Sequence, residues 1–213
     1  MTKIIMVRHG QSMSNIAATF TGQLDAPLSP LGVKQAQIVK KYITENFSID
    51  AVYSSDLSRA YDTALPTARY FGKEIIKTKA LREIDGGLWQ GETFDYIEKT
   101  YPEDYSVWRS DIGKAVCTGG ESLAELAKRV SDFVFASANE NFGKTVMLAT
   151  HATPVRAFTA VCRFGDILRM KDIPWYPNAS VSVFEYDGKS MIPVICGFSD
   201  HLSDLITELP DNC

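Results

Sequence analysis

Residues 2–10, TKIIMVRHG, and residues 145–154, TVMLATHATP, decide the fold because they share one layout. In each, a short apolar run, residues 4–7 or residues 146–149, has the length of a buried strand. Each run leads within two residues into a histidine, His9 or His151. The chain is therefore expected to carry two buried strands that end in polar loops.

Three further sites carry the signals of a helix start: Ser29 with Pro30, Asp56, and Thr153 with Pro154. The helix that Asp56 is expected to cap should run towards Gly72, and Pro66 should kink it. The helix opened by Thr153 should reach Gly165. Helices are thus expected between the strands.

Four more short runs have the character of strands: residues 49–53, 74–78, 181–186 and 191–196. Asp187-Gly188 predicts a hairpin turn between the last two, and Pro193 favours an edge position for its strand. The alternation of strands and helices predicts a three-layer α/β/α fold with a mainly parallel sheet and an antiparallel edge strand.

A segment rich in aromatic and acidic residues, residues 92–118, precedes a helix expected over residues 122–138. We interpret it as a small helical lid inserted into a single domain of residues 1–213. Its aromatic residues could form the lid's own core, or they could line a specificity pocket together with Trp89 and Trp175-Tyr176-Pro177. The sequence favours the first alternative and leaves the second open.

Composition and charge exclude several classes of protein. The formal net charge is −4 with mixed signs throughout, which argues against nucleic acid or a membrane surface as partner. No apolar run approaches the ~20 residues that span a bilayer, and no signal-peptide pattern is present, so we expect a cytoplasmic protein. The four cysteines are widely spaced and predict reduced thiols: Cys117, Cys162, Cys196 and Cys213. A homodimer is left open.

Five polar side chains are expected to meet at one rim of the sheet. Ligand crevices in wound sheets lie outside the carboxyl ends of the strands. Arg8 and His9 follow the first strand, and Arg59 begins the helix after the second. Glu83 follows the third strand, and His151 follows the later apolar strand. If the sheet is parallel, all five therefore converge.

This set of side chains suits phosphoryl transfer, which depends on positioning and on stabilising charge on the phosphoryl oxygens. A neutral His9 can attack phosphorus if its other ring nitrogen donates to a nearby backbone carbonyl. Glu83 lies in an aromatic, Gly-rich stretch, where desolvation would favour the protonated acid that a leaving alkoxide needs. Once ionised, it could activate water.

Each of these side chains also has a plain structural interpretation. An arginine or glutamate is commonly a solvated surface charge, and a histidine is commonly a satisfied structural imidazole. His201 lacks the position after a strand and is assigned that structural role. Metal catalysis is disfavoured because the sequence has no H-E-x-x-H motif and no clustered aspartates.

The string RHGQSMSN at residues 8–15 closely resembles the signature of the histidine phosphatase, or phosphoglycerate-mutase-like, superfamily. The match continues in order along nearly the whole chain: TGQLDAPLSPLG from Thr21, SSDLSRAYDTA from Ser54, LREIDGGLWQG from Leu81, GGES from Gly119 and THATPVRA from Thr150. Two departures stand out, Thr118 in place of a common proline, and Pro66 within a helix.

The resemblance implies roles for individual residues and the absence of any metal or organic cofactor. His9 would be the phosphorylated nucleophile and Glu83 the proton donor. The phosphate ligands implied are Arg8, Asn15, Arg59 and His151. The residues implied at the substrate entrance are Thr21, Gly22 and Gln23.

Within the superfamily, the short chain and its LREIDGGLWQG stretch resemble the phosphatase branch. The expected activity is metal-independent hydrolysis of small phosphate monoesters, as in the branch of histidine acid phosphatases. One alternative is a phosphoglycerate mutase, which would use the same phosphohistidine and exclude water. Another is a non-catalytic phosphate-ligand binder that has lost turnover. The sequence does not identify the physiological substrate.

Overall fold

The computed structural model describes residues 1–207, in which six strands form one sheet: β1 (Thr2–Arg8), β2 (Ala51–Ser55), β3 (Ile75–Thr78), β4 (Thr145–Thr150), β5 (Val181–Tyr186) and β6 (Met191–Phe198). Their order across the sheet is β3-β2-β4-β1-β5-β6. The first four in this order pair in parallel, and β5 pairs antiparallel with both β1 and β6. The antiparallel strand therefore lies one place in from the edge, which β6 with Pro193 forms.

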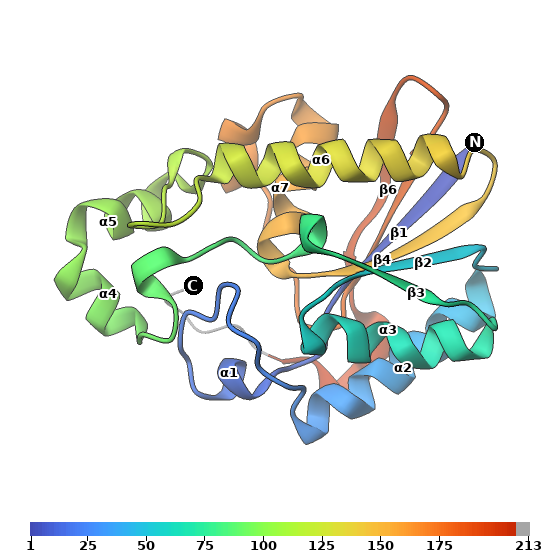
Figure 1. Ribbon diagram of the computed structural model, residues 1–213, viewed down its shortest axis with the longest axis horizontal. Coiled ribbons are helices and arrows are strands. Elements are labelled where there is room, and N and C mark those ends of the chain that lie inside the picture. The colour runs from blue at the N-terminus through green and yellow to red at the C-terminus, as the bar shows by residue number, and fades with distance from the viewer. Residues whose placement is uncertain (208–213) are drawn as a thin grey trace.

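Helices cover both faces of this sheet (Figure 1). The α-helices are α1 (Met13–Ile16), α2 (Pro30–Asn46), α3 (Ser58–Tyr70), α4 (Phe94–Thr100), α5 (Pro102–Ser110), α6 (Leu123–Glu140) and α7 (Ala152–Phe164). Helices α2 and α3 lie on one face, and α6 and α7 lie on the other. The predicted α/β/α layering is confirmed.

Alternation of side chains along the central strand explains why both faces are covered. In β1, Ile4 and Met6 pack into the core beside α6 and α7, whereas Ile5 and Val7 pack into the core beside α2 and α3. All four side chains have no solvent-exposed area. Successive residues of a strand point to opposite faces, so an unbroken apolar run needs a helical layer on each side.

The start of α2 fixes the loop that follows β1. Ser29 caps the helix by accepting a hydrogen bond from the Gly32 N–H at 3.0 Å, and Pro30 occupies the first turn, as predicted. A Cβ atom on Gly10 would lie 2.7 Å from the Gly32 carbonyl oxygen. Likewise, a Cβ on Gly32 would overlap the Gln11 carbonyl oxygen. The two glycines let this loop rest directly on the helix.

Two predicted helix caps are wrong. Helix α3 has Leu57 at its N-cap position without a side-chain cap, because the Asp56 carboxylate is taken by Arg82, which donates two hydrogen bonds of 2.6 Å. Helix α7 begins at Ala152, with His151 and not Thr153 at the N-cap. Its predicted end is confirmed, since Gly165 adopts a φ of +69° at the C-cap.

Short 3₁₀ segments complete the described chain: η1 (Lys79–Leu81), η2 (Gly87–Trp89), η3 (Ile112–Lys114), η4 (Ile167–Asp172) and η5 (Asp200–Leu205). Helix α3 continues through Pro66 as one helix. Three of the cysteines, Cys117, Cys162 and Cys196, are free thiols, and Cys213 lies outside the described residues. No helix within residues 1–207 has both the length and the apolar character needed to cross a membrane.

The connections leave the sheet in opposite directions at its centre. From β1 the chain moves through α2 to β2 on one side, whereas from β4, which pairs with β1, it moves through α7 to β5 on the other. The carboxyl ends of β1 and β4 therefore flank a topological switch point, where wound sheets bind their ligands. His9 follows β1 there and His151 follows β4.

Candidate active site

A cavity of about 90 Å³ opens at this switch point. Seven of the nine residues expected at the site line it: Arg8, His9, Asn15, Thr21, Gly22, Arg59 and Glu83. The other two, Gln23 and His151, do not line it. The five residues that follow the strands converge as expected. Four of them line this cavity, and the fifth, His151, packs against His9.

The His9 ring is held in one orientation. Its Nδ1 lies 2.7 Å from the Gly10 carbonyl oxygen, so Nδ1 carries the proton and donates. The backbone around it is also tied down, because the His9 N–H donates to Thr150 and the Gly10 N–H donates to Thr63 Oγ1. With the proton on Nδ1, the Nε2 atom of the neutral imidazole keeps its lone pair.

His151 lies behind His9, with the two ring centroids 5.1 Å apart. The Nδ1 of His151 accepts a hydrogen bond of 3.2 Å from Arg59 Nε, so its proton is on Nε2, 2.9 Å from Ser55 Oγ. This buried imidazole supports Arg59 in the observed structure. A direct bond from His151 to the phosphate stays a prediction.

Arg59 is a buried cation that is held in place by three hydrogen bonds and keeps further N–H donors unused. It is 1 % exposed, and besides Nε it donates from Nη1 to the Leu24 carbonyl and from Nη2 to the Gly22 carbonyl, both at 2.8 Å. A guanidinium has five N–H donors, so two are left for oxygens in the cavity. Burial lowers the pKa of Arg59 to about 10, partly opposed by Glu83 and Asp25, so it stays charged at neutral pH.

Both histidines are held in the neutral form. Burial, followed by the charges of Arg59 and Arg8, keeps the pKa of His9 well below its usual value of 6.5. Burial and Arg59 also lower the pKa of His151. A neutral imidazole is the form that can act as a nucleophile, so His9 should stay reactive at pH values where an exposed histidine would be protonated.

We expect the stability of the protein to fall as the pH drops below about 6.5. At a pH between its two pKa values, a histidine whose pKa is lower in the folded state is protonated in the unfolded chain and neutral in the folded protein. Its contribution to the free energy of unfolding is therefore complete above the pKa of the unfolded state. The contribution is lost as the pH falls towards the pKa of the folded state. Each of the two histidines should add a slope of up to about 1.4 kcal/mol per pH unit. Urea unfolding of the wild type and of His9→Gln between about pH 7 and pH 5 measures this, and equal slopes would contradict it.

Glu83 sits where β3 and α7 converge on the cavity. It is half-buried, and its Oε1 accepts a hydrogen bond of 2.8 Å from the Ile84 N–H. Its Oε2 accepts one of 3.3 Å from the Thr153 N–H in the first turn of α7. The desolvation expected from the sequence is therefore only partial, and two backbone donors fix the carboxyl group beside the cavity.

Arg129 of α6 holds the backbone under Glu83, and the sequence analysis did not identify it. Its guanidinium donates to the carbonyls of Ala80, Arg82 and Glu83 at 2.8–2.9 Å. It also donates to both carboxylate oxygens of Glu121 at 2.6 and 2.9 Å. These partners lie up to 49 residues away along the chain, so no local pattern could have revealed the network.

The remaining predicted ligands divide into two groups. Asn15 Oδ1 accepts hydrogen bonds from Ser12 and from Asn178, which leaves the amide N–H₂ to donate to a bound oxygen. Thr21 and Gly22 line the cavity as expected. Gln23 instead bridges Arg82 and the Glu83 carbonyl and lines a neighbouring hollow. Its contact with substrate stays a prediction.

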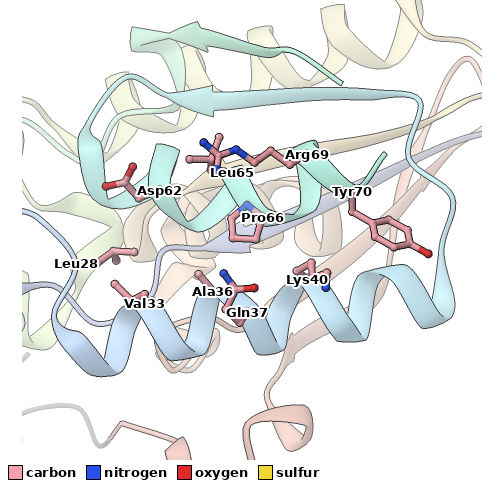
Figure 2. A pocket seen from close by; sticks show the side chains of 10 residues that line it. All are labelled: Leu28, Val33, Ala36, Gln37, Lys40, Asp62, Leu65, Pro66, Arg69 and Tyr70. Carbon is pink, nitrogen blue, oxygen red and sulfur yellow. The ribbon is translucent and has the colours of Figure 1, made fainter. Parts of the chain in front are cut away.

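A larger groove, of about 620 Å³, lies between α2 and α3 (Figure 2). Val33 and Lys40 on α2 face Asp62 and Tyr70 on α3 across it. None of the predicted site residues lines this groove. Size alone therefore does not locate the chemistry, and the smaller cavity holds the histidine and the two arginines.

His201 takes the structural role assigned from the sequence. Its ring packs against both Tyr42 and Phe198, which also contact each other, and its Nε2 lies 3.1 Å from the Ala179 carbonyl oxygen. Across the described part of the chain, no group of three or more histidine, cysteine, aspartate or glutamate side chains is arranged to hold a metal ion.

Comparison with known proteins gives consistent matches over almost the full length. Residues 4–195 match the model of the histidine phosphatase superfamily (branch 1). Phosphoserine phosphatase 1 of Hydrogenobacter thermophilus is 32 % identical over 208 residues, covering 98 % of each chain. The metal-independent phosphoserine phosphatase of Arabidopsis thaliana is 34 % identical over 212 residues, covering 96 % of this chain and 84 % of the relative.

The fold has close counterparts among solved structures. The Bacillus stearothermophilus protein YhfR superposes with a TM-score of 0.90 at 25 % identity, covering 95 % of this chain and 100 % of that one. The family match over residues 4–195 includes every predicted site residue, from Arg8 to His151.

Proposed function

Since this chain belongs to the histidine phosphatase superfamily (branch 1) and is a phosphatase of that superfamily, we propose that it hydrolyses small phosphate monoesters through a phosphohistidine on His9. Glu83 serves as the general acid and then as the general base. No metal ion takes part in the proposed reaction, in keeping with the name of the plant relative. The observation that carries the proposal is the neutral His9 imidazole with Nδ1 bound to Gly10 beside two buried arginines.

In the first step, His9 Nε2 attacks phosphorus and forms the N–P bond. The P–O bond to the leaving group breaks, and the departing oxygen takes the proton of Glu83. The hydrogen bond from Nδ1 to the Gly10 carbonyl stabilises the positive charge that the ring gains. Alcohol leaves, and the phosphoryl group stays on His9.

In the second step, a water molecule attacks the phosphoryl group. The Glu83 carboxylate takes a proton from this water, the N–P bond breaks, and its electron pair returns to His9. Phosphate, a neutral imidazole and a protonated Glu83 result, so the enzyme is ready for another cycle. Arg8, Arg59 and the Asn15 amide stabilise the charge on the phosphoryl oxygens in both steps.

Residues 92–118 serve as a lid over the cavity in this proposal. Phe94, from α4, and Trp108, from α5, both line the cavity that holds His9. Closing such a segment over a phosphohistidine would control the access of water and of leaving group. The cytoplasmic location and the homodimer stay expectations from the sequence.

A panel of phosphate esters tests the proposal directly. Assays run with a chelator should release inorganic phosphate from several small monoesters at undiminished rates. A parallel assay for phosphoryl transfer between hydroxyl groups of phosphoglycerate should give little product compared with phosphate. If transfer between hydroxyl groups dominates, the enzyme is a mutase. Dependence on added metal would contradict the mechanism. Binding of the esters without turnover would identify a non-catalytic phosphate-ligand binder.

Arg59→Ala is expected to lower kcat/KM by about 10²–10³. The substitution removes a buried cation whose two remaining donors face the phosphoryl oxygens, and it also frees the His151 ring. Steady-state assays on an aryl phosphate measure the effect. The matched control is Arg69→Ala on the same helix, whose exposed side chain lies in the groove between α2 and α3 and should leave kcat/KM unchanged. Equal effects of the two substitutions would remove Arg59 from the mechanism.

A further inference from the structure

Ser55 is a buried hydroxyl behind the phosphate pocket, and it has no part in the proposed mechanism. It is the last residue of β2 and has no exposed area. Strands β2 and β4 pair in parallel, with Ser54 opposite Ala149, so the carboxyl ends of both strands reach the same edge of the sheet. This register brings Ser55 beside His151, which follows β4.

The hydrogen bonds around His151 fix the position of its proton. Arg59 Nε can only donate, and it lies 3.2 Å from His151 Nδ1, so Nδ1 must accept. A neutral imidazole carries one proton, which is then on Nε2. Ser55 Oγ lies 2.9 Å from Nε2, so the serine oxygen accepts this hydrogen bond. The three side chains therefore form one directed series, in which Arg59 donates to His151 and His151 donates to Ser55.

The two adjacent histidines carry their protons on different nitrogens. His9 donates from Nδ1 to the Gly10 carbonyl, whereas His151 donates from Nε2 to Ser55. Their ring centroids are 5.1 Å apart, and both residues are at least nine-tenths buried. Because the two rings share the same buried surroundings, the difference comes from their hydrogen-bond partners. For His151 these partners are Arg59 and Ser55.

The Arg59 guanidinium is held from two sides. On one side, Nη1 and Nη2 donate to the carbonyls of Leu24 and Gly22. On the other side, Nε donates to His151. Without the imidazole, only the two carbonyls of one loop would hold the planar group. A cation stabilises a transition state best when it is already in place before charge develops. The contact at Nε therefore bears on catalysis.

We propose that Ser55 is a positioning residue for phosphoryl transfer: it accepts the hydrogen bond from His151 Nε2, keeps the Nδ1 lone pair directed at Arg59, and so holds the guanidinium where phosphoryl oxygens gain charge. This inference rests on the proposed function. Removal of the hydroxyl would leave a buried N–H without a partner, which folded proteins avoid. The ring would then turn towards another acceptor, and Arg59 would lose its partner at Nε.

A structural contact of Ser55 has to be separated from this role. Its Oγ also accepts a hydrogen bond of 3.3 Å from the N–H of Leu57, the N-cap residue of α3, and Leu57 supplies no side-chain cap. Loss of this contact would weaken the start of the helix that carries Arg59. Such an effect would be the same with or without the His151 ring. The two roles therefore differ in their dependence on the imidazole.

NMR of the imidazole nitrogens tests the hydrogen-bond series without reference to activity. The chain has three histidines, and His151→Ala and His201→Ala assign their signals. In the wild type, His151 should be protonated at Nε2 and His9 at Nδ1. In Ser55→Ala, the Nε2 proton of His151 should exchange with water at least about 10-fold faster. A wild-type His151 protonated at Nδ1, or a His151 spectrum unchanged in Ser55→Ala, would overturn the proposal.

A double-mutant cycle tests the effect on catalysis. Ser55→Ala should lower kcat on an alkyl phosphate about 5- to 30-fold with little change in KM. The loss should be smaller than in Arg59→Ala, because Arg59 keeps its two carbonyl partners. In a His151→Ala background, Ser55→Ala should cost less than about 2-fold more. A full additional loss in that background would show that Ser55 acts through α3 and would overturn the proposal.

Ser54→Ala is the matched control, since Ser54 is equally buried in the same strand and its Oγ donates to the Ser55 carbonyl. It should leave kcat largely unchanged, and thermal unfolding checks that all variants are folded. Equal losses in Ser54→Ala and Ser55→Ala, in an enzyme that forms the phosphoenzyme, would overturn only the role of Ser55. If the wild type hydrolyses no phosphate ester and forms no phosphoenzyme, both proposals fail together.

Discussion

His9→Ala should abolish phosphoenzyme formation and lower kcat/KM by about 10⁴-fold or more, the largest loss expected for any substitution in this chain. The substitution removes the Nε2 lone pair that the mechanism uses as its nucleophile. Arg8 and Arg59 remain in the variant, so phosphate binding should largely persist. Steady-state kinetics over a range of substrate concentrations measure the loss of turnover, and calorimetry measures phosphate binding separately.

His201→Ala is the matched control for the loss of an imidazole. That ring stacks on Tyr42 and Phe198, away from the cavity, so turnover should change little in the folded variant. Unfolding curves show how much stability its removal costs. Full turnover by His9→Ala would overturn the assignment of the nucleophile.

The second large effect is expected for Glu83→Gln, and it should depend on the leaving group. Loss of the acid should cost about 10²–10⁴ in kcat on an alkyl phosphate, whose alkoxide needs a proton. On p-nitrophenyl phosphate, whose phenolate leaves without one, the loss should be much smaller. Glutamine keeps the size of the side chain, and its carbonyl oxygen can still accept from Ile84 or Thr153.

Glu98→Gln is the control for the charge change, because Glu98 is an exposed carboxylate on α4. It should leave both substrates unaffected. Equal losses of activity on the alkyl and aryl esters in Glu83→Gln would indicate that Glu83 binds substrate and does not transfer a proton.

Features that depend on neighbouring residues could be predicted from the sequence. The buried strand at the N-terminus, the Ser29 cap and the hairpin at Asp187-Gly188 each carry their signal within a few residues, and all are present. Placement of Arg8 and His9 at the carboxyl end of β1 needed only the additional assumption of a parallel sheet. The grouping around the cavity followed from the order of the strands.

Features that depend on distant partners could not be predicted. Asp56 has the side chain of a helix cap, but Arg82, 26 residues away, takes its carboxylate. In the sequence, Arg129 is one of several charged residues of an amphipathic helix. Only in the folded protein does it donate a hydrogen bond to the Glu83 carbonyl. The family resemblance implies that His151 binds the phosphate, and only the structure shows its hydrogen bond with Arg59. Local sequence patterns do not predict contacts between residues that are far apart in the chain.

The aromatic residues show where a pattern leaves two alternatives open. Trp89 has no exposed area and bonds Thr118, which in turn donates to Asp104 of α5, so it belongs to the core on which residues 92–118 pack. Trp108 belongs to that core and also lines the cavity. The sequence presented these as alternatives, whereas the fold allows one side chain to do both.

The central claim is tested most directly by quenching the enzyme in alkali during turnover of an aryl phosphate and mapping the modified peptide by mass spectrometry. A phosphoramidate survives alkali and is lost in acid, unlike a phosphoserine ester. The mechanism predicts one phosphoryl group on the peptide that contains His9, formed and lost at rates that match turnover. Turnover without that modification, or with the phosphoryl group on another residue, would contradict it.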